Sequence, residues 1–320
     1  MKIITNEVFL AHDTGAHPEN KQRLQVFTSE KSQEITVPGE EYLHLVHHAD
    51  HIHFIREASS KYWNKIDQDT IVCSESYLAA VNAVGATLMA TATNDFALVR
   101  PPGHHAYPSR ASGFCLFNNI AIAAEKFRRE GKRVCIIDFD GHRGDGTSAI
   151  FYDTDEVLYW SLHQFPAFPG GGLPDEIGSG NGKGFTLNNP LPPDSGDDIF
   201  MHAFDNFLPV IEQFNPDIIA VSAGFDAHRY DPLLQLNLSC NVFYDMGIKM
   251  AKLNSRLFAT LEGGYNTEIL PLCVYNFMAG VNGEPIFHDE GYTTSNRRSW
   301  ETYDLSLHIG VSKLSPYWKF

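Results

Sequence analysis

Residues 134–146 read VCIIDFDGHRGDG, and this stretch decides the fold class. The stretch opens on an apolar, mostly β-branched run from which we predict a strand over 134–139. A short apolar run of this kind is typical of a strand that is buried on both faces, as in a parallel sheet. Similar runs, rich in β-branched or aromatic residues, occur at 96–99, 157–162, 218–222 and 257–261.

Longer segments with a helical pattern lie between these runs, at 76–91, 118–129, 199–214 and 242–255. Strands that alternate with helices predict βαβ units and a parallel sheet. The sequence contains no internal repeat, low-complexity segment or long linker that would divide it. The prediction is therefore one α/β domain over residues 1–320, built on an open parallel β-sheet with helices on both faces.

Polar, backbone-permissive loops follow the predicted strands. In open α/β sheets, ligands bind outside the carboxyl ends of the strands, so these loops are expected to meet at one site. The loops read RPPGHH (100–105), DGHRGDG (140–146), HQFPAFPGGG (163–172), AGFDAH (223–228) and EGGYN (262–266).

Asp138, Asp140 and His142 alternate along an extended segment, so their side chains are expected to point to the same side. A carboxylate and an imidazole two residues apart can both reach one divalent ion at about 2 Å. A further carboxylate, Asp226, stands at another predicted strand end. Three ligands of the Asp, His and Asp type leave a fourth position for water, which is the arrangement of a catalytic zinc site.

Two adjacent histidines, His104 and His105, follow Pro-Pro-Gly at the same edge of the predicted sheet. Imidazole titrates near neutral pH and can serve as general base and general acid, provided that a partner fixes its second nitrogen. Asp138 and Asp145 are available as such partners. Tyr265 follows two glycines and could donate a hydrogen bond to a carbonyl oxygen as negative charge develops there.

Composition restricts the class of protein. The formal net charge of −15 argues against a nucleic-acid partner and suits a cationic substrate, although an acidic surface also simply favours solubility. Five scattered cysteines without a CxxC pair predict reduced thiols. The sequence shows neither a secretory h-region nor a run of about 18 apolar residues, so we expect a cytoplasmic protein without membrane association.

Taken together, the motifs resemble the histone deacetylase and acetylpolyamine amidohydrolase family, whose fold is that of arginases and deacetylases. The resemblance covers roughly residues 12–280 and is closer to the class II branch than to class I. The matching segments, in chain order, are HPENKQRL (17–24), RPPGHHA (100–106), SGFCLFNN (112–119), DFDGHRGDG (138–146), SLHQF (161–165), FPG (168–170), AGFDAH (223–228), DPL (231–233) and LEGGYN (261–266).

The resemblance implies a role for each matching position. Asp140, His142 and Asp226 would hold Zn²⁺, and Tyr265 would polarise the acetyl carbonyl. The acid–base set would be His104 with Asp138 behind it and His105 with Asp145 behind it. The substrate would be held by the rings of Phe114 and Phe168, the backbones of Gly113 and Gly264, Leu233, and Asp69 as a clamp on the substrate backbone. A structural K⁺ would bind the backbone oxygens of Asp138, Asp140, His142 and Leu162 and the hydroxyl of Ser161.

Two positions depart from the family pattern. Arg143 stands where most members have a second histidine, and Gly141 stands where bulkier residues are usual. Arg143 is expected to point to the other side of the segment, so zinc binding should survive. Gly141 could loosen the local backbone.

The implied activity is removal of acetyl groups from acetyl-lysine side chains of proteins or peptides by metal-activated water. The alternative within the family is deacetylation of small acetylated amines such as acetylpolyamines. A polyamine-specific relative has a motif that resembles Asp-Pro-Glu, whereas the corresponding segment here is DPL (231–233). Leu233 in place of a glutamate favours acetyl-lysine. An arginase-type pair of metal ions would need carboxylates at positions 144 and 228. These positions are Gly144 and His228, so we do not expect a second metal ion there. A catalytically silent acetyl-lysine binding module would be expected to lack a ligand or Tyr265.

A histidine cluster lies earlier in the chain. Its spacing could place imidazoles on one helical face, but without accompanying Cys or paired carboxylates we predict a surface helix rather than a metal site. The cluster comprises His44, His47, His48, His51 and His53.

Overall fold

The computed structural model describes residues 1–61, 63–253 and 255–320. Over these ranges the chain forms a seven-stranded sheet in the order β1-β4-β9-β8-β5-β6-β7, and every pairing within it is parallel. The open parallel sheet predicted from the sequence is therefore confirmed. Its strands are β1 (Ile3–Ile4), β4 (Phe96–Ala97), β9 (Arg256–Leu261), β8 (Ile218–Ala223), β5 (Val134–Asp138), β6 (Val157–Gln164) and β7 (Thr186–Leu191).

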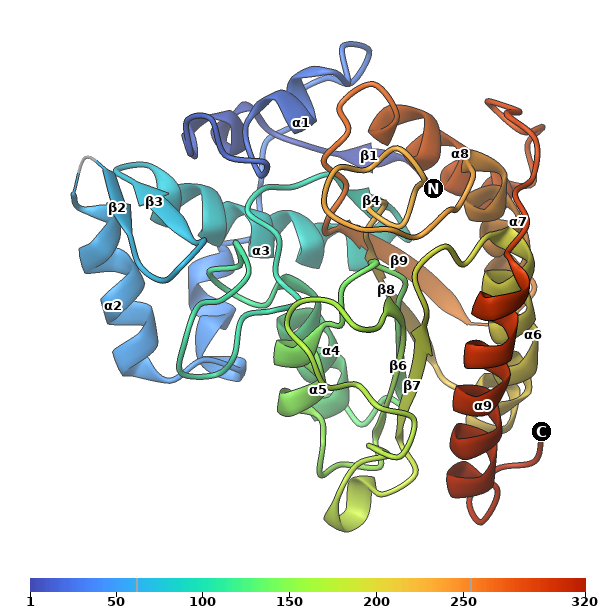
Figure 1. The fold of residues 1–320 in the computed structure, drawn as a ribbon. Coiled ribbons are helices and arrows are strands. Elements are labelled where there is room, and N and C mark those ends of the chain that lie inside the picture. Colours follow the sequence, from blue (N-terminus) through green and yellow to red (C-terminus); the bar gives the residue numbers. More distant parts are fainter. Residues whose placement is uncertain (62, 254) are drawn as a thin grey trace.

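Helices cover both faces of the sheet (Figure 1). On one face α3 packs on β4 and β9, and α4 packs on β5 and β8. On the other face α6 packs on β6 and β7, and α7 and α8 pack against each other. The helices are α1 (Gln22–Gln25), α2 (Ala49–Ser59), α3 (Ser76–Thr93), α4 (Asn119–Arg129), α5 (Asp145–Ile150), α6 (Asp197–Phe214), α7 (Cys240–Ala251), α8 (Leu270–Asn282) and α9 (Arg297–Leu314).

Smaller elements lie outside these layers. Strands β2 (Trp63–Lys65) and β3 (Ile71–Cys73) form an antiparallel pair, and short 3₁₀ turns occupy η1 (Glu7–Ala11), η2 (Gly39–Leu45) and η3 (Gly180–Gly182). Within the described ranges, each helix is too short or too polar to form a bilayer span.

The predicted central strands agree with the structure to within two residues. The predicted helices also match, although α7 begins at Cys240 rather than 242 and ends at Ala251, and position 254 of that prediction lies outside the described residues. The predictions missed strands β1, β2, β3 and β7 and helices α1, α5, α8 and α9. Strand β7 was missed because it reads TLNNPL, and its Pro190 is tolerated because β7 is at the edge of the sheet.

Strand register brings the functional loops together. Strand β5 is buried along its length and pairs with β6 and β8, with Asp138 opposite both Ser161 and Ser222. Strand β9 continues the same register, because Thr260 lies opposite Ser222. The loops after β5, β8 and β9 therefore leave the sheet side by side, at one edge.

The predicted surface helix is wrong for two members of the histidine cluster. His47 and His51 are buried, and both hold the loop before α4. Nδ1 of His47 donates to the carbonyl of Tyr107 at 3.0 Å, and its Nε2 accepts the backbone N–H of Asn118 at 2.9 Å. His51 reaches the carbonyl of Leu116 at 2.9 Å. These imidazoles therefore replace water as partners of a buried backbone segment.

This role predicts a pH-dependent stability. Burial, together with repulsion from His51, lowers the pKa of His47 from 6.5 to about 3. Between pH 6.5 and 4.5 the unfolded chain takes up a proton at this position that the folded chain refuses, so the free energy of unfolding falls as the pH falls. His47→Gln should reduce this fall by about 2 kcal/mol.

The fall is measured by urea unfolding at pH 6.5 and 4.5. His53→Gln is the matched control, because His53 is exposed on the neighbouring helix α2. The free energy of unfolding of this variant should fall by as much as that of the unmodified protein. An equal fall in the His47→Gln protein would contradict the assignment.

Candidate active site

Two carboxylates and one imidazole converge at the carboxyl edge of the sheet. Backbone N–H groups hold both carboxylates: Asp140 Oδ2 accepts from Gly263 at 2.7 Å and its Oδ1 from His142 at 2.8 Å, and Asp226 Oδ1 accepts from Gly141 at 2.7 Å. Asp140 Oδ1 and Asp226 Oδ2 face His142 Nδ1, at 3.2 Å and 2.8 Å. The three ligand atoms lie within 4.8 Å of one another, which is the proximity that the sequence predicted.

Glycines make room for these carboxylates. A Cβ on Gly263 would lie 2.3 Å from Asp226 Oδ2, and a Cβ on Gly224 would lie 2.0 Å from Asp140 Oδ2. Both carboxylates therefore pack directly on bare backbone, which orients them for a common partner. Gly141, where bulkier residues are usual in the family, is also tightly packed: a Cβ there would lie 2.3 Å from the side chain of Leu234, which fills that space.

The donor set fits a divalent metal ion. Asp140 and Asp226 are wholly buried, and within the described ranges all their ion pairs involve histidines. Burial lowers the pKa of His142, but the Asp226 and Asp140 carboxylates outweigh it and raise the pKa to about 10. A bound cation would take over the neutralising role of that proton. Two oxygens and one nitrogen, with room for an exogenous ligand, suit a catalytic metal centre.

The histidine pair lies beside this centre, with the two ring centroids 4.0 Å apart. His104 Nδ1 is 3.2 Å from Asp138 Oδ2, and His105 Nδ1 is 2.7 Å from Asp145 Oδ1, so the structure places each histidine beside its predicted partner. Burial lowers the pKa of His104, but Asp140 and Asp138 together hold it well above its usual range. Burial and repulsion from His104 lower the pKa of His105 to about 4.

Two tyrosines that the sequence reasoning missed support these carboxylates. Tyr159 donates its hydroxyl to Asp138 Oδ2 at 2.9 Å, and Tyr107 donates to Asp145 Oδ2 at 2.8 Å. Each carboxylate therefore has a second fixed partner, so its orientation toward the imidazole is set before substrate binds. Tyr107 and Tyr159 lie outside the predicted loops, and the sequence offered no signal for them.

Tyr265 is positioned by its backbone and by a buried arginine. Its N–H donates to Asp231 Oδ2 at 2.7 Å, and the Arg23 guanidinium lies 4.9 Å from the centre of its ring. Arg23 also donates to the carbonyls of Glu262 and Gly264, each at 2.6 Å. Gly264 has a φ of +116°, which only glycine adopts readily, so this bend fixes the turn that presents Tyr265.

A buried ion cluster lies behind this turn. Glu19 binds Arg23 Nη1 at 3.1 Å and Arg100 Nη2 at 2.8 Å, and all three side chains are fully buried. Burial raises the pKa of Glu19, but the two arginines outweigh it, Arg100 foremost, and lower the pKa to about 2. The i, i+4 spacing of Glu19 and Arg23 within HPENKQRL was the one available sequence signal, and no role was predicted for either residue.

Glu262 is another missed residue. Its Oε2 accepts the backbone N–H groups of Gly103 and His104, at 2.7 and 3.1 Å, and it thereby fixes the loop that carries the histidine pair. Burial is the main reason that the pKa of Glu262 rises to about 7. Glu262 is the first residue of the EGGYN motif, but a carboxylate at a strand end does not by itself indicate which backbone groups it binds.

A cavity of about 240 Å³ reaches His142, one of the three candidate metal ligands. The Phe168 ring lies edge-on to His105, at 5.2 Å between centroids, and the Phe114 ring lies edge-on to Tyr265 at 5.7 Å. The two aromatic rings are thus gathered on the same cavity as the histidine and the phenol. The lining residues are Asp69, His105, Gly113, Phe114, His142, Phe168, Leu233 and Tyr265.

Asp69 stands on this cavity as a half-buried carboxylate. Burial and the neighbouring Asp67 raise its pKa to about 6. The turn that presents it is fixed because Asp67 Oδ1 accepts the N–H groups of Asp69 and Thr70. Thr70 in turn accepts the N–H of Phe114 at 3.1 Å, so this turn is connected to one aromatic wall.

The remaining predicted positions lie behind the ligands. Ser161 and Leu162 are buried on β6, with Ser161 Oγ at 2.9 Å from His163 Nδ1. The potassium site assigned to them stays a prediction. Arg143 pairs with Glu176 at 2.9 Å and contacts Ser148, so its charge is matched away from the ligand oxygens.

Known proteins resemble this chain over most of its length. The family model described as "Histone deacetylase domain" matches residues 17–281. A "Probable deacetylase" of Archaeoglobus fulgidus is 38% identical over an alignment that covers 99% of this chain and 98% of that protein. A "Histone deacetylase-like amidohydrolase" of Pseudomonas aeruginosa is 37% identical, with 80% of this chain and 73% of that protein covered.

Two solved structures are similar over most of their length. The HD domain of HDA15 superposes with a TM-score of 0.87 at 30% identity, over 99% of this chain and 94% of that one. An acetylpolyamine aminohydrolase from Burkholderia pseudomallei gives a TM-score of 0.81 at 27% identity, over 88% and 98%. The chain therefore belongs to the histone deacetylase family of amidohydrolases.

Proposed function

We propose that the protein is a zinc-dependent deacetylase that hydrolyses the acetyl amide of acetyl-lysine side chains in proteins or peptides. The observation that carries the proposal is the cavity itself. It is lined by the rings of Phe114 and Phe168 and by His105, His142 and Tyr265, and Phe168 is exposed whereas His105 and His142 are buried. Aromatic walls next to buried polar groups suit a methylene chain that carries an amide at its tip.

Substrate binding would use the cavity walls. The methylene groups of the substrate would lie between the rings of Phe114 and Phe168, with the Gly113 backbone and Leu233 beside them. Gly113 has no room for a side chain, because a Cβ there would lie 2.4 Å from the His105 ring. Asp69 would accept a backbone N–H of the peptide at the mouth, and Gly264 would shape the passage through the turn before Tyr265.

The chemistry would divide between metal and protein. A zinc ion held by Asp140, His142 and Asp226 would supply Lewis acidity toward water and the acetyl carbonyl. His105 would accept the proton of the attacking water, because its lowered pKa leaves Nε2 unprotonated while Nδ1 donates to Asp145. His104 would stay protonated beside Asp138, and an imidazolium of the pair would give a proton to the departing amine.

Tyr265 would stabilise the developing oxyanion. Burial holds the pKa of this phenol well above its usual range, so it remains a hydrogen-bond donor at neutral pH. Asp231 and Arg23 fix the turn on either side of it, so the donor is in place before the reaction begins.

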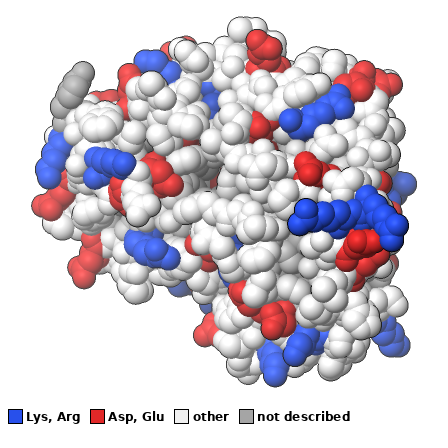
Figure 2. Space-filling view, in the orientation of Figure 1, with Lys and Arg blue, Asp and Glu red and all other residues white. Residues whose placement is uncertain are grey.

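The proposal extends to the cofactors, partners and location. A structural K⁺ would use backbone oxygens of Asp138, Asp140, His142 and Leu162 and the Ser161 hydroxyl. Acetylated peptides or amines would be the partners rather than nucleic acid: basic and acidic side chains are scattered among each other over the mostly uncharged face drawn in Figure 2, whereas nucleic-acid binding uses a basic face. A cytoplasmic location accords with the five free, buried cysteines. The whole of residues 1–320 would act as one deacetylase domain.

Acetylpolyamines are the second candidate substrates. The similarity to an acetylpolyamine aminohydrolase supports them, as does the carboxylate of Asp69 at the cavity. Leu233 supports acetyl-lysine instead, because an apolar side chain offers a distal ammonium group no partner.

Steady-state kinetics on an acetyl-lysine peptide and on N-acetylputrescine separate the two substrates. We expect the larger kcat/KM for the peptide. A preference of more than about tenfold, roughly 1.4 kcal/mol, for N-acetylputrescine would overturn the choice of lysine. His105→Ala should abolish turnover of both substrates, and zinc-loaded protein that turns over neither would instead indicate an acetyl-lysine binding module.

Tyr265→Phe tests the oxyanion role. Removal of one donor should lower kcat by about 10² to 10³ with a much smaller change in KM, because the lost hydrogen bond forms mainly in the transition state. Tyr230→Phe is the matched control, since Tyr230 is an exposed tyrosine on the neighbouring loop, and it should leave kcat unchanged. A Tyr265→Phe protein with unaltered kcat would refute the assignment.

A further inference from the structure

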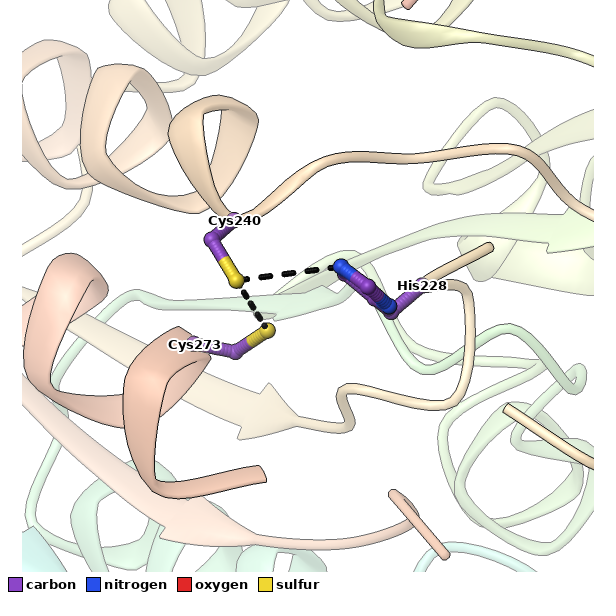
Figure 3. Close-up of side chains that lie close together, drawn as sticks. All are labelled: His228, Cys240 and Cys273. Atoms are coloured by element: carbon purple, nitrogen blue, oxygen red, sulfur yellow. Dashed lines mark hydrogen bonds between the residues drawn. The ribbon is translucent and has the colours of Figure 1, made fainter. Parts of the chain in front are cut away.

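A second group of metal-type donors lies outside the cavity. His228 comes from the loop after β8, Cys240 is the first residue of α7, and Cys273 lies in α8 (Figure 3). Cys240 Sγ is 3.4 Å from Cys273 Sγ and 3.7 Å from His228 Nε2. All three side chains are buried, and their ligand atoms lie within 4.8 Å of one another.

A carboxylate stands beside these three donors. Glu290 Oε2 lies 3.1 Å from His228 Nε2, and the same carboxylate contacts Cys240. The backbone N–H of Glu290 donates to Asn241 Oδ1 at 3.1 Å, which holds the carboxylate against the start of α7. Three donors from the β8–α7 loop and two helices therefore lie within 4.8 Å of one another, and the Glu290 carboxylate, from the segment between α8 and α9, lies beside two of them, His228 and Cys240.

The separations match those of ligands that share one tetrahedral ion. With Zn–S about 2.3 Å and Zn–N about 2.0 Å, neighbouring ligand atoms lie roughly 3.3–3.8 Å apart. The separations of 3.4, 3.7 and 3.1 Å fall at or close to this range. A disulfide would instead require an S–S distance of about 2.05 Å.

Charge and ligand type favour zinc. Two thiolates, one imidazole and one carboxylate form a soft, closed donor set, which is typical of structural rather than catalytic zinc. With Zn²⁺ this set would carry one net negative charge. The guanidinium of Arg229 offsets it, because its Nη2 lies 2.5 Å from Glu290 Oε1.

We propose that His228, Cys240, Cys273 and Glu290 form a second, structural zinc site. The ion would join α7, α8 and the segment at Glu290 to the loop that carries Asp226, two residues before His228. Binding would displace the proton from His228 Nε2 and place one on Nδ1, so the Tyr230 amide, now 3.2 Å from Nδ1, would turn away. The proposal concerns a site distinct from the catalytic one and does not depend on the substrate.

Cobalt substitution distinguishes the two sites. The catalytic ligands are two carboxylates and an imidazole, so a thiolate-to-cobalt charge-transfer band in the near ultraviolet can arise only from a site with cysteine ligands. We expect the chain loaded with Co²⁺ to show this band and to bind two ions, counted by elemental analysis. Cys240→Ser and Cys273→Ser should each abolish the band and halve the metal content.

Cys73→Ser is the matched control, because Cys73 is also buried but lies on β3, in a different part of the fold, and it should keep the band and both ions. Bound cobalt without the band, whether one ion or two per unmodified chain, would overturn the proposal, whereas one ion with the band would place the metal at this site and leave the catalytic ligands empty. An intact mass lighter by two hydrogen atoms that returns on reduction would also overturn the proposal, because it would show a Cys240–Cys273 disulfide. These measurements use the unmodified protein, so they remain decisive if a variant fails to fold.

Discussion

Buried negative charge at the carboxyl edge of the sheet is the constraint on which the rest of the site depends. Asp138, Asp140, Asp226 and Glu262 are wholly buried there. Removal of such a carboxylate from water costs several kcal/mol, so each must find a cation or a set of hydrogen-bond donors. Burial raises the pKa of Asp226, whereas neighbouring imidazoles and backbone N–H groups oppose this effect around the cluster. A divalent ion held by Asp140, His142 and Asp226 would complete the balance.

The charges of Arg23 and Arg100 are correspondingly placed behind the site rather than within it. Arg23 and Arg100 share the buried Glu19. Arg23 also donates from Nε and Nη2 to the carbonyls of Gly264 and Glu262, just before Tyr265. An arginine with all its partners fixed can hold a turn without competing with the metal for carboxylate oxygens. Loss of Glu19 would leave two buried guanidiniums unpaired, so this cluster links the stability of the fold to the position of the phenol.

The apolar runs in the sequence and the polar residues that follow them allowed much of the fold and of the candidate site to be predicted. The buried runs of β4, β5, β8 and β9 and the loops after them predicted the sheet and placed the candidate ligand triad and the histidine pair at one edge of it, because parallel strands bring such loops together. Contacts between distant segments were not predictable. Nothing in the local sequence connects Tyr159 to Asp138 or Glu262 to the Gly103 amide, and the buried roles of His47 and His51 contradicted the surface helix expected from their spacing. Strand β7 was not predicted because its asparagines and proline are unusual in a buried strand, although its position at the edge of the sheet permits them.

The most direct test of the account is anomalous X-ray scattering from crystals of the zinc-loaded protein, recorded on both sides of the zinc absorption edge. The account predicts a peak about 2 Å from Asp140 Oδ1, His142 Nδ1 and Asp226 Oδ2. A map that shows these three side chains together but has no anomalous peak between them would contradict the central claim that this buried charge is arranged to hold a metal ion.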